Sequence, residues 1–305
     1  MQQPQRPLVI VHANCMDGTG AAYAASLFLN NPEYHAAAYG TEPPDVHDRD
    51  VYVLDFAYAR EVLLDMAAAA RSLVVIDHHA TAEAALGGLD FAHFDMTKSG
   101  CVLTWEYFAA LYPSHLHPGM GIPTVLLYIQ DRDLWQWLLP NSPAISEYLR
   151  HPDIIDIKAP VAEQVVKMST VSANWSSCYN GMVDDGEAML RDKDRLVRDI
   201  AARAAYMTFS IDGVPYNVPV VYAPTHVTSE VGQRLAQSSP LGVGAVIGAY
   251  THGHYGLSFR GVRGTTLARL LAEAYGGGGH DCAAGCGVLP TTLALLIATT
   301  APIEL

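Results

Sequence analysis

Histidine and aspartate residues recur just after short apolar runs in the first half of the sequence. The runs 8–11, 51–54 and 73–76 consist largely of Val, Leu and Ile, as buried strands do. A fourth apolar run spans 124–129. Polar residues that could bind a metal follow these four runs: His12, Asp17, Asp55, Asp77, His78, His79 and Asp131. Carboxylates and imidazoles together suit Mn²⁺, Zn²⁺ or Fe²⁺ better than Ca²⁺ or Mg²⁺ alone. The pattern therefore indicates a site for a divalent metal.

The elements that must position these residues can be predicted from the same stretch. Ala-rich helical segments at 21–29 and 60–70 separate the predicted strands. Short buried strands that alternate with helices predict βαβ units and a parallel sheet with helices on both faces. Ligands of such a sheet bind beyond the carboxyl ends of its strands, so we expect the polar residues to converge there. A further helix is predicted over 101–111, with Ser99 as its N-cap.

A change in composition divides the chain, and the predicted fold class is α/β with a second, smaller α+β domain. Residues 153–205 are predicted to be mostly helical, and the highly charged segment 186–205 predicts a solvated connecting helix. Beyond it, segments 214–222, 243–250 and 255–260 have the composition of strands. The predicted boundaries are a first domain at 1–185, a helical linker at 186–206, a second domain at 207–290 and a tail at 291–305.

Charge and composition exclude several classes of partner. The chain of 305 residues has 18 Lys and Arg against 31 Asp and Glu, for a net charge of −13. A surface this acidic lacks the electrostatic footprint for long duplex nucleic acid, so a phosphate ligand requires a local pocket with metal cations. No run approaches the ~18 apolar residues of a membrane span, so no membrane partner is expected. Five scattered cysteines do not form a secreted disulfide framework, and a reducing, cytoplasmic setting is expected. The oligomeric state is left open.

Two motifs resemble those of a known family. The string VVIDHHAT at 74–81 resembles the signature of the DHH phosphoesterase superfamily. The string GGGGHDCAAG at 276–285, with the SFRG segment around Arg260 before it, resembles the glycine-rich motif of the accessory DHHA1 domain. The two motifs occur in the family's order, so the resemblance covers nearly the whole chain. It implies a DHH domain at 1–185 and a DHHA1 domain at 207–290, in the oligoribonuclease-like and exopolyphosphatase-like branch.

The resemblance implies a pair of divalent cations, with Mn²⁺ as the expected ion. By resemblance, His12 and Asp55 would hold one cation. The other would be held by Asp17, Asp55, His78 and Asp131, so that Asp55 would bridge the two. Two cations that share a water can activate it for attack on phosphorus.

The remaining motif residues are assigned other roles by the resemblance. His79 corresponds to the second histidine of the motif, which lies against the substrate. Asp77 would orient the neighbouring imidazole, as carboxylates behind a ligating histidine do. Asp133 is an alternative to Asp131, which is preferred because it aligns with the fourth motif of the family.

One position departs from the family pattern. Where the family usually has the first of two aspartates after the histidine, the sequence HANCMDG has Cys15 and keeps Asp17. Cys15 can be a thiolate ligand that favours Zn²⁺ or Fe²⁺. Alternatively, Cys15 binds no metal, and the cation beside it is held weakly by His12 and Asp55. In the third alternative the site at His12 and Asp55 is empty, and a single cation performs the chemistry. The sequence leaves these three alternatives open.

The second motif predicts a substrate-binding surface. Glycines at 277–279 would allow backbone amides to approach a phosphate closely. Arg260 and His280 would supply donors to a terminal phosphate. The residues predicted to bind substrate are Arg260, Gly277, Gly278, Gly279 and His280.

The predicted function is that of a metal-dependent phosphodiesterase acting on short nucleotides, either short oligonucleotides or linear dinucleotides. One alternative is a phosphoanhydride hydrolase for polyphosphate or pyrophosphate, which would be expected to have more Lys and Arg near the motifs than this chain has. The other alternative is a catalytically degenerate nucleotide-binding protein. It is suggested by Cys15, which stands where the family usually has an aspartate. The sequence contains no GxSxG or Walker A motif, which argues against acyl hydrolysis and NTP-driven work.

Overall fold

The chain divides into two compact units, residues 1–190 and 191–305. The computed structural model describes residues 5–117, 119–251, 253–298 and 301–302. Each unit contains its own sheet. The described helices include none that is both long enough and apolar enough to cross a membrane.

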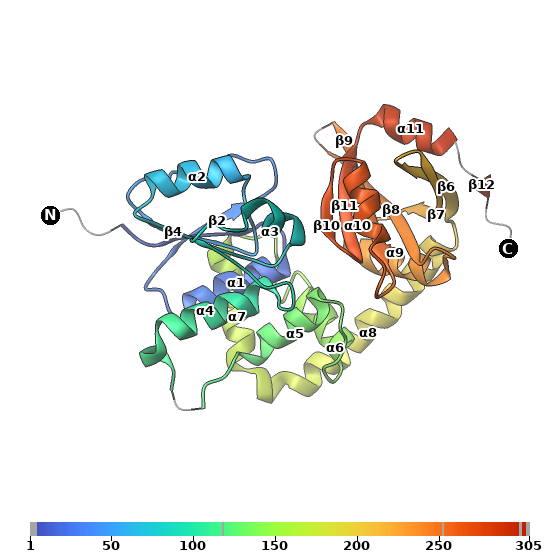
Figure 1. Cartoon of the computed structure of the whole chain (residues 1–305). Coiled ribbons are helices and arrows are strands. Elements are labelled where there is room, and N and C mark those ends of the chain that lie inside the picture. The colour runs from blue at the N-terminus through green and yellow to red at the C-terminus, as the bar shows by residue number, and fades with distance from the viewer. Residues whose placement is uncertain (1–4, 118, 252, 299–300, 303–305) are drawn as a thin grey trace. The chain divides into compact units, whose positions relative to one another are not determined.

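Five parallel strands form the sheet of the described part of the first unit (Figure 1). Their order is β2-β1-β3-β4-β5, which places the three strands that carry motif residues side by side in the middle. The strands are β1 (Leu8–His12), β2 (Glu33–Ala37), β3 (Asp50–Leu54), β4 (Ser72–Asp77) and β5 (Ala92–Phe94). The predicted parallel sheet is confirmed, and the two edge strands β2 and β5 are additions to it.

Helices cover both faces of this sheet, as predicted (Figure 1). Because side chains alternate across a strand, Val9 and Val11 pack into one core and Leu8 and Ile10 into the other. The first core also contains residues of α1 (Met16–Ser26), α4 (Gly100–Leu111), α5 (Thr124–Asp133), α6 (Ser142–Leu149) and α7 (Val161–Ala173). The second contains residues of α2 (Arg60–Ala69) and α3 (Ala80–Leu86).

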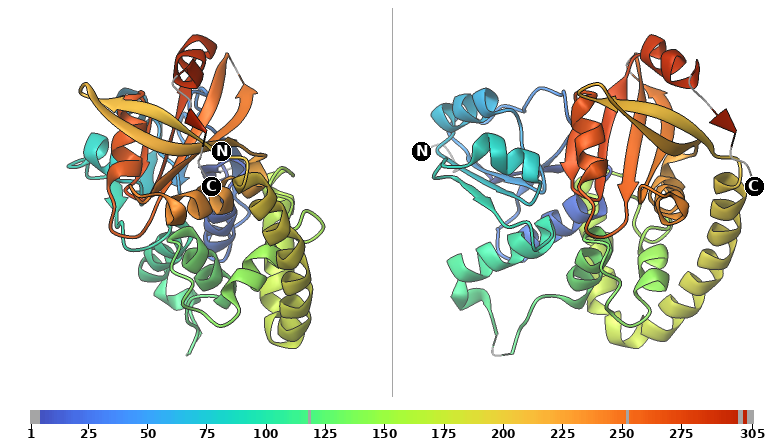
Figure 2. Two further views of the ribbon diagram at one scale, coloured as in Figure 1. Left: turned by 90° about the vertical axis from the view of Figure 1, so that its right-hand side faces the viewer. Right: turned by 45° about the vertical axis from the view of Figure 1, so that its right-hand side comes forward.

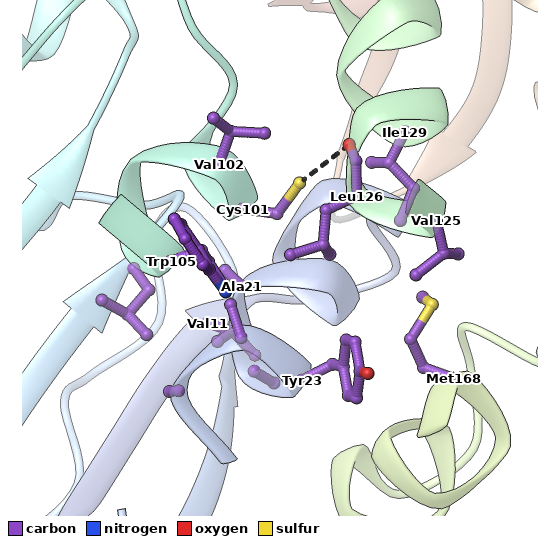
Figure 3. Packing of buried hydrophobic residues seen from close by; sticks show 14 of the residues in the cluster. Val11, Ala21, Tyr23, Cys101, Val102, Trp105, Val125, Leu126, Ile129 and Met168 are labelled. Carbon is purple, nitrogen blue, oxygen red and sulfur yellow. Dashed lines mark hydrogen bonds between the residues drawn. The ribbon is translucent and has the colours of Figure 1, made fainter. Parts of the chain in front are cut away.

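The apolar run 124–129 is not a further strand of the sheet. It forms α5, which packs on α1 and α4 beside the sheet. Figure 3 shows this packing: Leu126 of α5 lies against Cys101 of α4, whose Sγ donates to the carbonyl of Leu126, and Val125 lies beside Met168 of α7. The sequence predicts that Asp131, which follows this run, joins the polar residues at the strand ends, but it does not show that the run is a helix, because a buried helix and a buried strand can have the same apolar composition. Because the run is helical, Asp131 and Asp133 point in different directions, and only one of them can reach the strand ends.

The described part of the second unit contains a mainly antiparallel sheet of seven strands (Figure 2). Its order is β10-β11-β9-β8-β7-β6-β12, and only the pair β7–β8 is parallel among the described pairs. The strands are β6 (Ala205–Ile211), β7 (Val214–Tyr222), β8 (Val243–Thr251), β9 (His254–Gly261), β10 (Gly278–His280), β11 (Ala283–Val288) and β12 (Ala301–Pro302). The predicted strands at 214–222, 243–250 and 255–260 are all present.

Helices lie on both faces of the second sheet as well. Residues of α10 (Leu267–Ala274) and α11 (Pro290–Ala298) share a core with Phe209 and Phe259. Residues of α9 (Thr228–Ser238) pack against Val246, which faces the other side of β8. The apolar segment 293–298 of α11 contributes Leu293 and Leu296 to the first of these cores.

A long helix, α8 (Trp175–Ala201), runs from the first unit into the second. The predicted linker at 186–206 covers only its second half, and residues 205 and 206 already belong to β6. In the predicted tail at 291–305, β12 pairs with β6 and is therefore part of the second sheet.

Candidate metal centre

The predicted metal ligands lie at the carboxyl ends of three adjacent strands. The register pairs Val11 of β1 with Leu54 of β3, and Leu54 with Ile76 of β4. His12, Asp55 and Asp77 each come one residue after this row. They therefore lie in a line across the end of the sheet, where the strand order alone places them close together.

Asp55 lies in the centre of this line, and its two carboxylate oxygens face different groups. Its Oδ1 lies 3.2 Å from Nε2 of His78. Its Oδ2 accepts a hydrogen bond from Sγ of Cys15 at 3.4 Å and lies 3.9 Å from Nδ1 of His12. The backbone of Asp55 is left-handed, with φ of 55°, a conformation in which Asp and Asn are enriched. Asp55 is thus placed to bridge two cations.

His78 is the centre of the second group. Three carboxylate oxygens surround its Nε2: Oδ1 of Asp55 at 3.2 Å, Oδ2 of Asp17 at 3.5 Å and Oδ2 of Asp133 at 3.6 Å. His78 is almost fully buried. One imidazole and three carboxylates within this space form a donor set for a divalent cation.

Asp17 reaches this group from the first turn of α1. Both of its carboxylate oxygens also accept hydrogen bonds from the start of α4, at 2.6 Å from the Gly100 amide and 3.0 Å from the Cys101 amide. Ser99 occupies the N-cap position, as predicted, but its side chain makes no capping hydrogen bond. The buried carboxylate of Asp17 therefore satisfies the amides of the helix and is held in place by them.

Gly100 is required where α4 approaches Asp55. A Cβ atom at this position would lie 2.6 Å from Cβ and 2.9 Å from Cα of Asp55. We expect Gly100→Ala to lower the free energy of unfolding by about 1–3 kcal/mol, as overpacking of a rigid core does. It should also weaken Mn²⁺ binding, because Asp55 must move. Thermal unfolding and calorimetric titration measure both effects.

The matched control for Gly100→Ala is Gly181→Ala in α8. A Cβ at Gly181 would meet nothing within 4 Å. This substitution should stabilise the protein by about 0.5–1 kcal/mol, because alanine has the higher helix propensity, and leave Mn²⁺ affinity unchanged. Equal stability of Gly100→Ala and the wild type would contradict the close approach.

Asp133, rather than Asp131, belongs to the group around His78. Residues two apart on a helix point about 200° away from each other, so only one of these aspartates can face the strand ends. The carboxylate of Asp131 is buried elsewhere and accepts hydrogen bonds from the amides of Leu138 at 2.8 Å and Leu139 at 3.2 Å. The preference for Asp131 is therefore corrected: this side chain closes the turn after α5 and lies outside the cluster.

Asp77 holds His79 and the backbone that follows β4. Its Oδ1 accepts from the amide of His78 at 2.7 Å and lies 2.7 Å from Nδ1 of His79. Asp77 is fully buried, and its Oδ2 has no hydrogen-bond partner among the described residues. Asp77 thus orients the second histidine of the motif.

Burial and crowding shift the acidities of the cluster. Burial, with repulsion from Asp17, raises the pKa of Asp55 well above its usual value. Desolvation and the charge of Asp17 also raise the pKa of Asp133, to about 6. Burial acts to raise the pKa of Asp17, but His78 and the hydrogen bonds from Cys101 outweigh it, and the pKa is lowered.

The histidines of the cluster are shifted in opposite directions. Burial, together with the charge of His79, lowers the pKa of His12, which keeps its imidazole neutral as a ligand must be. Burial opposes the charged form of His79 too, but its hydrogen bond to Asp77 prevails and raises its pKa.

The donor set fits a pair of divalent cations. Buried carboxylates are costly unless a positive charge compensates them, and the raised pKa of Asp55 reflects that cost. His12, Cys15 and Asp55 offer one set of ligand atoms within 4.8 Å of one another, and Asp17, His78 and Asp133 offer another. The arrangement therefore suits cations held by nitrogen and oxygen donors.

Two tryptophans, Trp135 and Trp137, lie two and four residues after Asp133, and no role for them is predicted from the sequence. Trp135 and Trp137 have left-handed backbones, with φ of 53° and 57°, and their rings meet edge to face at 4.9 Å. Such φ values are strained for bulky residues and occur where the surroundings enforce them. The segment DRDLWQW, with two of the four tryptophans of the chain within three residues, is the signal that could have identified them.

In the second unit, Arg260 and His280 lie on one face of the sheet. The register aligns Arg260 of β9 with Ala283 of β11, and Ala283 with His280 of β10. Residues aligned across neighbouring strands share a face, so the two side chains are about 10 Å apart on it. Arg260 also donates to the Ser229 hydroxyl of α9 at 3.2 Å. The binding of substrate by these residues stays a prediction.

The pairing of β10 with β11 explains why glycines occur at 277–279. A Cβ at Gly277 would lie 2.1 Å from the carbonyl oxygen of Gly285, and one at Gly279 would lie 2.7 Å from that of Ala283. The left-handed backbone at Gly279 also favours glycine, with φ of 138°. Gly278 pairs with Gly285. The sheet thus requires two of these glycines, and phosphate binding by all three stays a prediction.

Comparison with known proteins identifies similar chains. No family model matches this chain. The uncharacterized protein R106 of Acanthamoeba polyphaga mimivirus is 26% identical over 306 residues, which cover 92% of this chain and 67% of the relative.

Similar solved structures include a protein named as a phosphodiesterase and one named as exopolyphosphatase-related. The pGpG-specific phosphodiesterase PggH of Vibrio cholerae is 12% identical over 97% of this chain and 99% of its own, with a TM-score of 0.46. An exopolyphosphatase-related protein of Bacteroides fragilis is 16% identical over 96% and 91%, with a TM-score of 0.44. An uncharacterized protein of Helicobacter pylori G27 is 12% identical over 93% of each chain, with a TM-score of 0.40.

Proposed function

We propose that this chain is a metal-dependent phosphoesterase that hydrolyses phosphodiester bonds in short nucleotides. The observation that carries the proposal is the position of Asp55, whose Oδ1 faces His78 and whose Oδ2 faces His12 and Cys15. A carboxylate divided in this way between two donor groups is a bridging ligand of a two-cation site. Its burial beneath the strand ends keeps the bridge rigid.

The side chains of the cluster have distinct roles in this proposal. His12 and Asp55 hold one cation, and Asp17, Asp55, His78 and Asp133 hold the other, with Asp133 in the place first given to Asp131. A pair of divalent cations bound there, expected to be Mn²⁺, would supply an activated water and neutralise charge on the phosphate oxygens. The amides of Gly100 and Cys101 hold the carboxylate of Asp17 in place, so this side chain need not move when a cation binds.

His79 is the residue proposed to handle a proton. Its Nδ1 is engaged with Asp77, and that contact raises the pKa of His79. A protonated His79 can donate from Nε2 to the oxygen that leaves phosphorus, or hydrogen bond to the phosphate. Asp77 fixes the ring orientation that this role requires.

Two observations favour short nucleotides as the substrate class. The net charge of −13 disfavours long nucleic acids, whose binding depends on many phosphate contacts. Trp135 and Trp137 come two and four residues after Asp133 and are partly exposed, and aromatic side chains of this kind stack on nucleobases. Polyphosphate has no base to stack, so a phosphoanhydride hydrolase would have no use for this pair.

The test is hydrolysis by the full chain with Mn²⁺, and with a chelator in its place. The substrates are the dinucleotide pApA, inorganic polyphosphate and an aryl phosphodiester. We expect Mn²⁺-dependent release of AMP from pApA and none after chelation. Orthophosphate release from polyphosphate alone would establish the anhydride hydrolase instead. Turnover of no substrate, with pApA still bound, would indicate a degenerate nucleotide-binding protein.

A further inference from the structure

We propose that the two cation positions are chemically unlike: Cys15 ligates, as a thiolate, a Zn²⁺ or Fe²⁺ ion held with His12 and Asp55, while the group around His78 takes Mn²⁺. The inference rests on the two-cation site of the proposed function and specifies which ion each half of it selects. It assigns a role to the residue that the sequence left open.

The geometry around Cys15 is that of a ligand set. Its Sγ lies 3.4 Å from Oδ2 of Asp55, and Nδ1 of His12 lies 3.9 Å from the same oxygen. The three ligand atoms all lie within 4.8 Å of one another. Ligand atoms that share one tetrahedral Zn²⁺ are about 3.3–3.8 Å apart, given bond lengths near 2.0–2.3 Å. Small rotations of these side chains are therefore enough to close the set on one ion.

The backbone holds Cys15 in this position. Cys15 is the N-cap residue of α1, between His12 at the end of β1 and Asp17 in the first helical turn. The left-handed residue Asn14, with φ of 55°, turns the chain from the strand into the helix. Without a cation the thiol stays protonated, because burial and the charge of Asp17 raise the pKa of Cys15 to about 11, and its Sγ donates to Oδ2 of Asp55. Binding forms the metal–sulfur bond and releases the thiol proton to solvent.

The other cysteines have different surroundings. Cys101 is fully buried and donates to the backbone carbonyl of Leu126. Cys178 is exposed on α8. Among the groups of potential ligands formed by described residues, Cys15 is the cysteine that lies with a histidine and a carboxylate.

The two donor sets differ in softness. One combines imidazole, thiolate and a single carboxylate, and thiolates select Zn²⁺ and iron over Mn²⁺. The other combines one imidazole with the carboxylates of Asp17, Asp55 and Asp133, and oxygen-rich sets suit Mn²⁺. A centre with one ion of each kind follows from these donors.

The first experiment is a titration of the metal-free full chain with Co²⁺, followed by absorption. Cobalt bound to a thiolate has an intense sulfur-to-metal charge-transfer band in the near ultraviolet, whereas nitrogen and oxygen ligands give none. We expect the band in the wild type and in Cys178→Ser, and its loss in Cys15→Ser. Zn²⁺ affinity should fall at least ~10-fold in Cys15→Ser, since even residues behind the ligands are worth that much.

The variant Cys15→Asp separates the thiolate from the position. It should bind two cations without the charge-transfer band and should bind Mn²⁺ at both positions. After purification, metal analysis should give one zinc or iron and one manganese for the wild type supplied with all three metals. Two equivalents of manganese in the wild type would overturn the inference.

A third experiment uses the wild type alone, so that its result does not depend on whether a variant folds. Alkylation of each cysteine by iodoacetamide is followed by mass spectrometry, with and without Zn²⁺. Zn²⁺ should slow alkylation of Cys15 at least ~10-fold and leave that of Cys178 unchanged, because only the ligated thiolate is protected. Equal alkylation of Cys15 in both states would overturn the thiolate assignment.

The outcomes distinguish this inference from the proposed function. Two bound Co²⁺ ions without a charge-transfer band would remove the thiolate ligand and leave the two-cation phosphoesterase standing. Absence of divalent cation binding of any kind would remove both. The band together with an inactive enzyme would leave the mixed centre standing and remove the hydrolase.

Discussion

Asp55→Asn should reduce Mn²⁺-dependent hydrolysis of pApA at least ~10³-fold, because loss of even one donor to the transition state costs ~10²–10³ and this change affects both cations. Asparagine keeps the size of the side chain and tolerates the left-handed backbone of Asp55. It removes the charge that faces His78 on one side and His12 on the other. Steady-state kinetics at saturating Mn²⁺ measure the loss.

The same substitution should not destabilise the metal-free protein. Burial and the charge of Asp17 raise the pKa of Asp55, so above that pKa the ionised form costs the folded state free energy. A neutral amide removes this cost, and the Tm of metal-free Asp55→Asn should equal or exceed that of the wild type. The increase in Tm that Mn²⁺ gives the wild type should be absent from the variant.

The control for Asp55→Asn is the same chemical change on an exposed helix. Asp65 lies on the solvent side of α2, and Asp65→Asn should keep both the activity and the Mn²⁺-induced increase in Tm. An Asp55→Asn protein that retains a tenth of wild-type turnover would contradict the bridging role.

The central strands could be predicted because they are apolar on both faces. Runs such as Leu8–Val11 are buried by helices on each side, which favours an uninterrupted run of Val, Leu and Ile. The edge strands β2 and β5 are polar or short, with sequences EYHAA and AHF, and seven of their eight residues are at least partly exposed. Their pairing depends on the neighbouring strand rather than on their own pattern.

The site could be predicted as far as the strand ends determine it. His12, Asp55 and Asp77 follow adjacent strands, and strand order brings them together without any knowledge of side-chain packing. The contact between Asp17 and the first amides of α4 could not be predicted, because it joins residues 83 and 84 positions apart. It arises from the packing of α1 on α4, where a Cβ at Gly20 of α1 would lie 2.8 Å from Cβ of Cys101.

The choice between Asp131 and Asp133 could not be predicted from the sequence either, because it too depends on how helices pack. It depends on which side of α5 packs against α1 and α4, and both aspartates follow the same apolar run. The sequence shows that an acidic residue is available there, whereas the rotation of the helix decides which one faces His78. A pair of substitutions can test that rotation directly.

Asp131→Asn should lower the free energy of unfolding by about 2–3 kcal/mol and leave the Kd for Mn²⁺ within about 3-fold of wild type. The carboxylate of Asp131 accepts from the amides of Leu138 and Leu139, and hydrogen bonds to charged groups are worth ~1.5–3 kcal/mol. An asparagine can accept one of these and must turn its own NH₂ towards the other donor, which then stays unsatisfied.

Asp133→Asn should give the opposite result. Its carboxylate lies 3.6 Å from Nε2 of His78 and near Asp17, whose charge helps to raise its pKa to about 6. Removing this charge should leave the Tm of the metal-free protein unchanged or higher, while Mn²⁺ affinity falls at least ~10-fold and turnover at least ~10²-fold. Denaturant unfolding without metal, and calorimetric titration with Mn²⁺ at a temperature where both variants are folded, give the two readings. A reversed pattern, with Asp131→Asn losing the metal and Asp133→Asn losing stability, would show that α5 is rotated by half a turn from the orientation described.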